Sequence, residues 1–178
     1  MSGAQGHAVR TEPQRWLGVV GLLVGSFLVI GLVPVRLEAE AAERIGVAPT
    51  ETSVRVRADL RADLLALTND ERASRGLQRL GQADRIARCA VRHSRRMADL
   101  GYLFHSGDAQ LREALEGSGW SFAGENVGAG GALEDVQEAF MNSAPHRHNV
   151  LGRSYDHAAV GIVEADGVVW VTVIFYGS

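Results

Sequence analysis

An uncharged apolar segment near the N-terminus, residues 16–35, most constrains what this chain can form. It lies between Arg15 and Arg36 and carries the sequence WLGVVGLLVGSFLVIGLVPV. A helix of this length, at about 1.5 Å per residue, matches the roughly 30 Å of a bilayer's hydrocarbon core. A buried core helix is the other interpretation, but the segment has no polar face to turn to solvent. The segment therefore predicts one transmembrane helix.

Two fates of this segment stay open, a retained anchor and a cleaved signal peptide. The sequence Ala39-Glu40-Ala41 loosely resembles a signal-peptide cleavage site. The apolar stretch is, however, longer than the usual hydrophobic core of a signal peptide. We favour the anchor for that reason.

The flanking charges do not set the orientation of the span, because Arg10 and Arg15 precede it while Arg36 and Arg44 follow it. Signal-like N-terminal segments translocate the chain that follows them. We therefore expect residues 1–15 to form a cytoplasmic head. The body is expected outside the cytoplasm, in a single-pass cell-membrane protein or, after cleavage, in a secreted one.

Charge and cysteine content exclude two classes of function. The 178 residues carry 18 basic side chains, all Arg, against 21 Asp and Glu, and the formal net charge is −3. With no basic excess, nucleic acid is not an expected partner. A single cysteine, Cys89, cannot form an internal disulfide or a Cys-rich zinc site.

The pattern of apolar residues divides the rest of the chain into a linker and one domain. Residues 36–57 have no helical or alternating periodicity and are expected to be a linker. Residues 58–178 are long enough to bury a core. Apolar spacing and terminal signals predict four helices in the domain, over 58–76, 84–101, 108–117 and 133–142, the last ended by Pro145.

The end of the chain has a different pattern. Residues 159–164 and 168–176 are rich in Val and Ile, and Ala165-Asp166-Gly167 between them suits a tight turn. They predict an antiparallel hairpin. Helices followed by too few strands for a barrel indicate an α+β fold, in which helices flank a small antiparallel sheet.

Three separated polar side chains are candidates for one site. His105 follows an aromatic patch, Glu125 lies in a Gly-rich apolar stretch and is expected on a short strand, and His146 follows a predicted helix end. Two imidazoles and a carboxylate can hold a divalent ion such as Zn²⁺ and leave a position open for water. They lie about 20 residues apart, without a spacing that forces them together, so the pattern alone is weak.

Five motifs stand in order along the chain: Leu67 to Leu77, Ala90 to Met97 with His93-Ser94, Phe104-His105, Gly124-Glu125-Asn126, and Asn142 to Leu151. Together they resemble the CAP superfamily of cysteine-rich secretory, antigen-five and pathogenesis-related class 1 proteins. The similarity is to bacterial SCP-like domains and covers about residues 60 to 177. The motifs are specific in combination, although each is weak alone.

The resemblance implies an α-β-α sandwich that is secreted or surface-exposed, with a cleft lined by two His and two Glu in animal and plant members. His105, Glu125 and His146 match three of those positions. Ser143 occupies the fourth, which is acidic in those members. With Glu125 as the single carboxylate, no second carboxylate is present to take the general-acid role while the first acts as general base. This departure favours a binding role over catalysis.

Three functions follow as hypotheses. The first is a ligand-binding module at the cell envelope, whose cleft of His105, Glu125, His146 and Ser143 holds a metal or a small polar ligand. Lipids, sterols and envelope polymers are candidate ligands. The second is a metal-assisted hydrolase, with Zn²⁺ on the two His and Glu125 as base or ligand. The third is a structural envelope protein. A Ser143 nucleophile with His146 as base is disfavoured because no oxyanion donor can be named.

Overall fold

The computed structural model describes residues 53–178. The apolar segment 16–35, for which a transmembrane helix is predicted, and the head over 1–15 lie outside the described residues. Within residues 53–178 there is no helix whose length and apolar character would let it cross a membrane.

The sheet is the centre of the described domain and has the strand order β1-β4-β5-β3. The three long strands pair antiparallel, whereas β2 pairs parallel with β4. The β4–β5 pairing confirms the predicted hairpin. The strands are β1 (Arg55–Val56), β2 (Gly81–Gln82), β3 (Phe122–Gly130), β4 (His157–Ala165) and β5 (Val168–Gly177).

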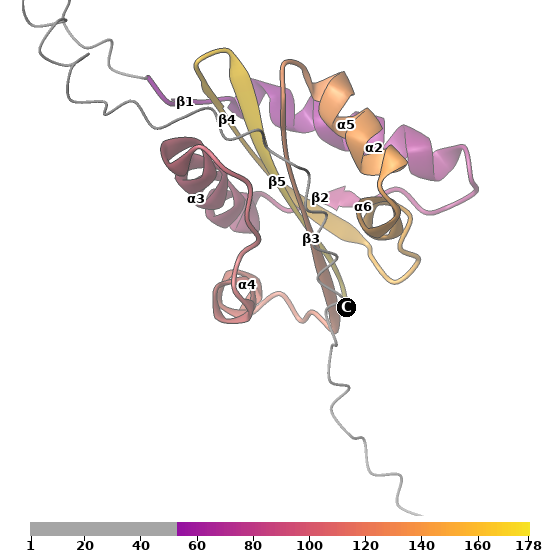
Figure 1. Ribbon diagram of the computed structural model, residues 1–178. Coiled ribbons are helices and arrows are strands. Elements are labelled where there is room, and N and C mark those ends of the chain that lie inside the picture. The colour runs from indigo at the N-terminus through magenta and orange to yellow at the C-terminus, as the bar shows by residue number, and fades with distance from the viewer. Residues whose placement is uncertain (1–52) are drawn as a thin grey trace, which may run out of the picture. The chain divides into compact units, whose positions relative to one another are not determined.

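Helices cover both faces of the sheet, which confirms the predicted α-β-α sandwich (Figure 1). One face carries α2 (Arg61–Ala73), α5 (Leu133–Asn142) and α6 (Ala144–Val150). The opposite face carries α3 (Asp84–Leu100) and α4 (Asp108–Leu115). A short 3-10 turn, η1 (Ala58–Leu60), precedes α2.

Three elements differ from the sequence-based expectation. The helix expected to end before Pro145 does end at Asn142, but an unexpected helix, α6, follows at once with Pro145 in its first turn, where proline's missing N–H costs no hydrogen bond. The short strand expected around Glu125 is the nine-residue β3, whose several glycines weaken the sequence signal of a strand. Strand β1 falls inside the range 36–57 expected to be a linker and pairs with β4.

Each face of the sheet has its own apolar core. The core under α2, α5 and α6 includes Leu64, Phe140 and Phe175, and the core under α3 and α4 includes Ile86, Leu115 and Ile174. Helix α3 approaches β4 so closely at Gly161 that a Cβ there would lie 2.2 Å from backbone atoms of the helix. Glycine is therefore required at this contact.

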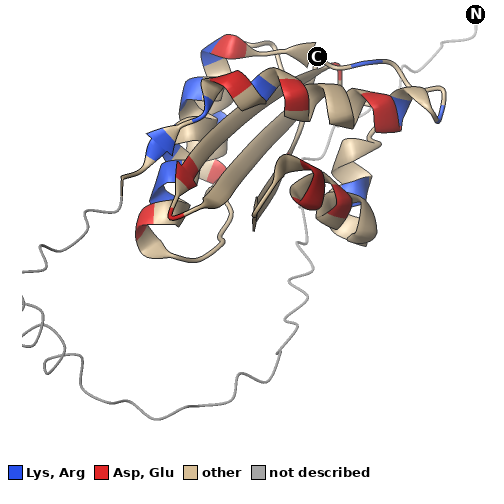
Figure 2. Cartoon of the chain, turned by 90° about the horizontal axis from the view of Figure 1, so that it is seen from above, with Lys and Arg blue, Asp and Glu red and all other residues tan. Residues whose placement is uncertain are grey.

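Charged residues lie mainly on the helices, and the long strands are almost free of them (Figure 2). Strand β5 has no Asp, Glu, Lys or Arg, β4 has only Glu164, and β3 has only Glu125. The interior of a protein disfavours an unpaired charge. The Glu125 carboxylate on β3 therefore needs specific partners.

Candidate functional site

Glu125 lies on β3, the strand at one edge of the sheet. It is paired with Ile174, which belongs to the core under α3 and α4. Directly opposite residues of paired strands project to the same face, so the Glu125 side chain points toward the α3 and α4 layer. Its side chain is only 5% exposed.

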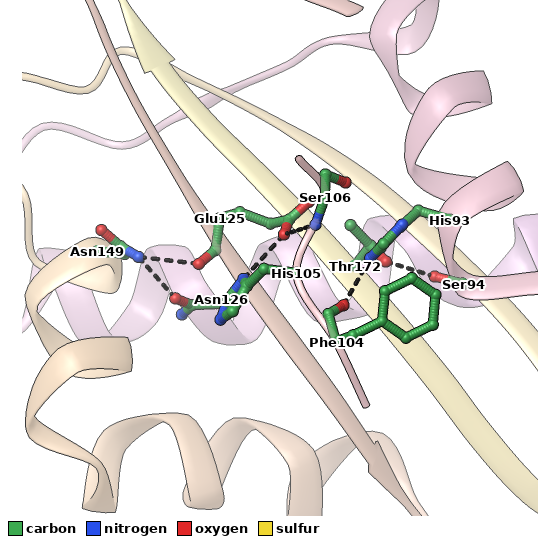
Figure 3. Close-up of polar contacts among 9 residues, drawn as sticks. All are labelled: His93, Ser94, Phe104, His105, Ser106, Glu125, Asn126, Asn149 and Thr172. Atoms are coloured by element: carbon green, nitrogen blue, oxygen red, sulfur yellow. Dashed lines mark hydrogen bonds and ion pairs between the residues drawn. The ribbon is translucent and has the colours of Figure 1, made fainter. Parts of the chain in front are cut away.

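The two carboxylate oxygens of Glu125 have different surroundings (Figure 3). Oε1 accepts a hydrogen bond from the Ser106 backbone N–H at 2.8 Å and lies 2.9 Å from His105 Nδ1. Oε2 is buried and has no hydrogen-bond partner among the described residues. Half of this carboxylate is therefore unsatisfied. A buried acceptor without a donor costs free energy.

The contact with His105 sets the charge state of both side chains. Burial raises the pKa of Glu125, but the hydrogen bonds from His105 and Ser106 outweigh it and hold that pKa below its ordinary value. The same contact raises the pKa of His105 above its ordinary value, against the opposing effect of burial. Both shifts favour the charged pair, a carboxylate beside an imidazolium.

The segment that carries His105 is fixed by the end of α3. Gly101 adopts a left-handed conformation with φ 72° and terminates the helix, so the chain turns back along it. His93 Nε2 lies 2.7 Å from the carbonyl oxygen of Phe104. The guanidinium of Arg96 lies 5.4 Å from the centre of the Phe104 ring. These contacts place the residue that follows Phe104 beside Glu125.

Helix α3 is itself fastened to the sheet by a buried polar contact. The Ser94 hydroxyl donates to the Gly161 carbonyl at 3.0 Å and is hydrogen-bonded to the Thr172 hydroxyl at 2.8 Å (Figure 3). The support of the His105 segment is therefore a rigid one.

His146 lies on α6, which packs against β3, and within residues 53–178 no hydrogen bond or ion pair joins its ring to His105 or Glu125. Its ring centroid lies 5.3 Å from that of Phe140. Burial lowers the pKa of His146, and the charge of His105 lowers it further. The pKa values of the two histidines thus shift in opposite directions, so that at a pH between them His105 is the protonated ring and His146 the neutral one.

Asn126 and Asn149 hold α6 against the strand that carries Glu125. Asn126 Nδ2 donates to the His146 carbonyl at 3.0 Å. Asn149 Nδ2 donates to the Glu125 carbonyl at 3.1 Å and to Asn126 Oδ1 at 2.8 Å. Neighbouring residues of β3 thus serve opposite faces of the sheet, since Glu125 contacts the His105 segment and Asn126 contacts α6.

Ser143 is the fourth residue of the expected set. It precedes α6, and its backbone carbonyl accepts a hydrogen bond from the Arg147 N–H at 2.8 Å. Among residues 53–178 its hydroxyl forms no hydrogen bond, with His146 or with any other group. A nucleophile needs a base within hydrogen-bond reach, so the geometry gives Ser143 no such role.

The residues were tested for their fit to Zn²⁺. Across the described part of the chain, no three or more His, Cys, Asp or Glu side chains gather closely enough to hold a metal ion. His105 turns Nδ1 to Glu125, which makes that carboxylate the partner of the imidazole. The described residues thus contain no preformed three-ligand zinc centre, although Nε2 of His105 is left as the nitrogen that an ion would bind, so metal binding at this site stays a prediction.

Sequence reasoning did not single out the groups that support the site. The Ser106 donor is a backbone N–H, which leaves no trace in side-chain chemistry. Asn126 and Asn149 stand inside recognised motifs, but their pairing across 23 positions of sequence needs the fold. Strand alternation at Glu125 was the one available signal that Asn126 serves the other face.

Comparisons with known proteins agree with this architecture. The profile of the cysteine-rich secretory protein family, CAP, matches residues 65–175. The Bacillus subtilis protein YkwD is 34% identical over 112 residues, which are 60% of this chain and 43% of that protein. The match thus spans less than half the length of this relative.

Two solved structures resemble the described domain. An extracellular protein of Bacillus anthracis with an SCP domain is 25% identical, with a TM-score of 0.58 over 66% of this chain and 40% of that one. An outer surface protein of Borrelia burgdorferi is 15% identical, with a TM-score of 0.63 over 71% of this chain and 98% of that one. The second likeness is one of fold alone. By its sequence match over residues 65–175, the chain belongs to the cysteine-rich secretory protein (CAP) family.

Proposed function

We propose that this CAP domain binds a polar polymer of the cell envelope, outside the cytoplasm, through His105, Glu125 and His146. The observation that carries the proposal is Glu125 Oε2, a buried acceptor without a donor. A ligand hydroxyl or amide N–H supplies the missing hydrogen bond. His105 is hydrogen-bonded to the other oxygen, and its side chain is 57% exposed, so it is the neighbour of Glu125 that a ligand meets from solvent.

The charges at the site complement a ligand rich in hydroxyl and amide groups. The protonated His105 ring donates to a ligand oxygen, whereas the neutral His146 ring has a nitrogen that accepts from a ligand hydroxyl. Glu125 Oε2 accepts a second donor. Amino sugars and peptide stems of peptidoglycan offer both donors and acceptors, which makes peptidoglycan fragments our preferred ligand class.

The proposed location rests on the relatives and on the N-terminal segment. The Bacillus anthracis protein is named as extracellular and the Borrelia burgdorferi protein as an outer surface protein. Residues 16–35 serve in this proposal as a membrane anchor or, if cleaved, as a signal for secretion. In either case the CAP domain faces envelope polymers.

Binding is favoured over catalysis by the composition of the site. It has one carboxylate, Ser143 stands at the position that is acidic in animal and plant members, and its hydroxyl contacts no base. The metal-assisted hydrolase needs three groups around one ion, an arrangement that the described residues lack. A structural role without a ligand is one of the outcomes of the following experiment.

The experiment is calorimetric titration of the full-length protein with soluble peptidoglycan fragments. Wild type is compared with Glu125→Gln and with Glu138→Gln, a matched change at an exposed position on α5. We expect saturable binding by wild type and Glu138→Gln, weakened about ten-fold or more in Glu125→Gln, because a hydrogen bond to a charged group is lost.

Two results contradict the proposal. Equal binding by wild type and Glu125→Gln would show that Glu125 takes no part in recognising the fragments. If no variant gives saturable heat, the domain has a structural role without this ligand. A parallel titration with Zn²⁺ compares wild type with His146→Ala. If Zn²⁺ binds saturably to wild type but not to His146→Ala, and if Zn²⁺ prevents fragment binding, the ligand of this site is a metal and not the polymer.

A further inference from the structure

A second cavity lies between α3 and α4, beside the His105 segment. Its volume is about 290 Å³. His105, Glu125 and His146 do not line it, although Ser106 does. It is therefore a different space from the proposed polymer site, and the two share only the short segment after Phe104.

The floor of the cavity is apolar. Ile174 of β5 and Ala114 of α4 are buried, and Leu111 and Cys89 are partly buried along its wall. An apolar floor of this kind favours a ligand with an apolar part, because that part leaves water on binding.

The mouth of the cavity carries two arginines without acidic partners. Arg92 and Arg96 are four residues apart on α3, so their side chains leave the same side of the helix. Among residues 53–178 neither guanidinium has a carboxylate oxygen within 4.0 Å. Arg92 contacts the Cys89 sulfur at 3.1 Å, and Arg96 lies against the Phe104 ring.

The other polar residues of the cavity leave the positive charge in excess. Glu113 of α4 is its one carboxylate, against two guanidinium groups. The Ser106 hydroxyl and the Gln110 amide add hydrogen-bonding groups, and the buried His93 directs Nε2 to the Phe104 carbonyl. A pair of guanidinium groups over an apolar floor suits an oxyanion attached to an apolar body.

We propose that this cavity binds a small organic anion, in which a phosphate or carboxylate group is carried on a compact apolar body. The anion pairs with Arg92 and Arg96, and the apolar body lies against Leu111, Ala114 and Ile174. The volume lies at the lower end of the range of ligand pockets, roughly 300–1,000 Å³, so the apolar body is compact. One aromatic ring or a short branched chain fits this description.

Cys89 offers a direct readout, because it lines the cavity and is the only cysteine of the chain. The full-length protein is reacted with methyl methanethiosulfonate, a small neutral thiol reagent, and the rate of Cys89 modification is measured. The probe is phenyl phosphate. Inorganic phosphate tests the anion alone, and phenol tests the apolar body alone.

We expect phenyl phosphate, at about ten times its Kd, to slow modification about ten-fold by mass action. Phosphate and phenol at the same concentration leave the rate close to that of the free protein. Arg92→Gln and Arg96→Gln each raise the phenyl phosphate concentration needed for protection about ten-fold, as expected for loss of a charge-assisted hydrogen bond. Arg95→Gln, the matched change at an exposed arginine that does not line the cavity, leaves it unchanged.

Three results overturn this proposal: no protection by phenyl phosphate, equal protection by phenol, or equal loss of protection in Arg95→Gln. Equal protection by inorganic phosphate also contradicts it, because the apolar floor then has no part in binding. His146→Ala keeps the protection in every case. The failure of the polymer site and the failure of this cavity can therefore be told apart.

Discussion

Arg72 and Glu125 are both buried charged side chains, one on each side of the sheet, and they differ in how their hydrogen bonds are satisfied. Arg72 on α2 is 1% exposed and donates to backbone carbonyls only. Glu125 has one satisfied oxygen and one orphaned oxygen. Among residues 53–178 these are the only Asp, Glu, Lys or Arg residues that are buried.

The Arg72 guanidinium fastens several loops at once. Its Nε and Nη1 atoms donate to three carbonyls at 2.8–2.9 Å, and its Nη2 atom donates to a fourth at 3.3 Å. Burial lowers the pKa of Arg72, yet each of its three guanidinium nitrogens has at least one carbonyl acceptor. The carbonyls belong to Gln78, Val150, Gly152 and Tyr155.

The difference separates a structural charge from a functional one. A buried charged group whose polar atoms all have partners stabilises the fold. One with an atom left without a partner costs stability unless a ligand supplies the missing hydrogen bond. We therefore expect changes at Arg72 to affect folding and changes at Glu125 to affect binding. The predictions that follow test this division, in order of decreasing effect.

Arg72→Ala should have the largest effect on stability. It removes the donor of four carbonyls, one buried and three partly buried, and leaves a cavity at a buried position, so it is expected to lower the free energy of unfolding by at least about 3 kcal/mol. Chemical denaturation measures the loss. Arg75→Ala, at an exposed position just after the same helix, removes only local contacts with Glu71 and Ser74 and should cost under about 1 kcal/mol. Equal losses in the two variants contradict the assigned role of Arg72.

Glu125→Gln should cost less, about 1–2 kcal/mol, because the amide keeps the shape and loses a charged hydrogen bond. Its larger consequence falls on His105, whose pKa returns toward its ordinary value of 6.5 when the carboxylate charge is gone. Titration of the imidazole signals by NMR measures this change. An unchanged pKa of His105 would show that Glu125 does not control its protonation.

Asn149→Ala should loosen α6 from β3. The side chain donates to the Glu125 carbonyl and to Asn126 Oδ1, and losing these contacts should cost about 1 kcal/mol. His146 shares α6, so its NMR signal should broaden or shift while that of His105 changes little. A shift of equal size in both signals speaks against separate supports for the two histidines.

His105→Asn should have the smallest effect, and one that depends on pH. Because the pKa of His105 is raised in the fold, its stabilising contribution is present below 6.5 and is lost as pH rises through the raised value. The lowered pKa of Glu125 keeps its own contribution present above its ordinary value of 4.5 and removes it as pH falls through the lowered value.

The pair therefore stabilises the fold most between those two ordinary values. The Tm of wild type should exceed that of His105→Asn at about pH 5.5, and by a smaller margin at about pH 8.5. The difference in free energy of unfolding should be under about 1 kcal/mol, because the imidazole is largely exposed. His148→Asn, an exposed change on α6, should show no such trend. A Tm difference for His105→Asn that does not vary with pH contradicts the charge assignment.

The sequence predicted the fold wherever local pattern decides structure. Apolar spacing located α2, α3, α4 and α5, and the turn at Asp166-Gly167 located the hairpin. It underestimated β3, because β3 is held by pairing with β5 along its full length and not by the strand preference of its glycines. It missed α6 because proline is read as a helix end, although proline is also favoured in a first helical turn.

The candidate site was predictable only in part. His105, Glu125 and His146 were found through motifs, and the structure brings His105 into contact with Glu125. The imbalance between Oε1 and Oε2 could not be foreseen, because it depends on a backbone N–H from a segment 19 positions away. The metal expectation came from residue types and stays a prediction, whereas the carboxylate–imidazole pair is seen in the structure.

The most direct test of the central claim, that the orphaned carboxylate oxygen marks a ligand site, is to follow the histidine side-chain NMR signals of the full-length protein during addition of soluble peptidoglycan fragments. We predict saturable shifts of His105 and His146, with His157 unchanged because it is paired with Asp156 on another part of the domain. Shifts that leave His105 and His146 unmoved, or that affect His157 equally, would contradict the account.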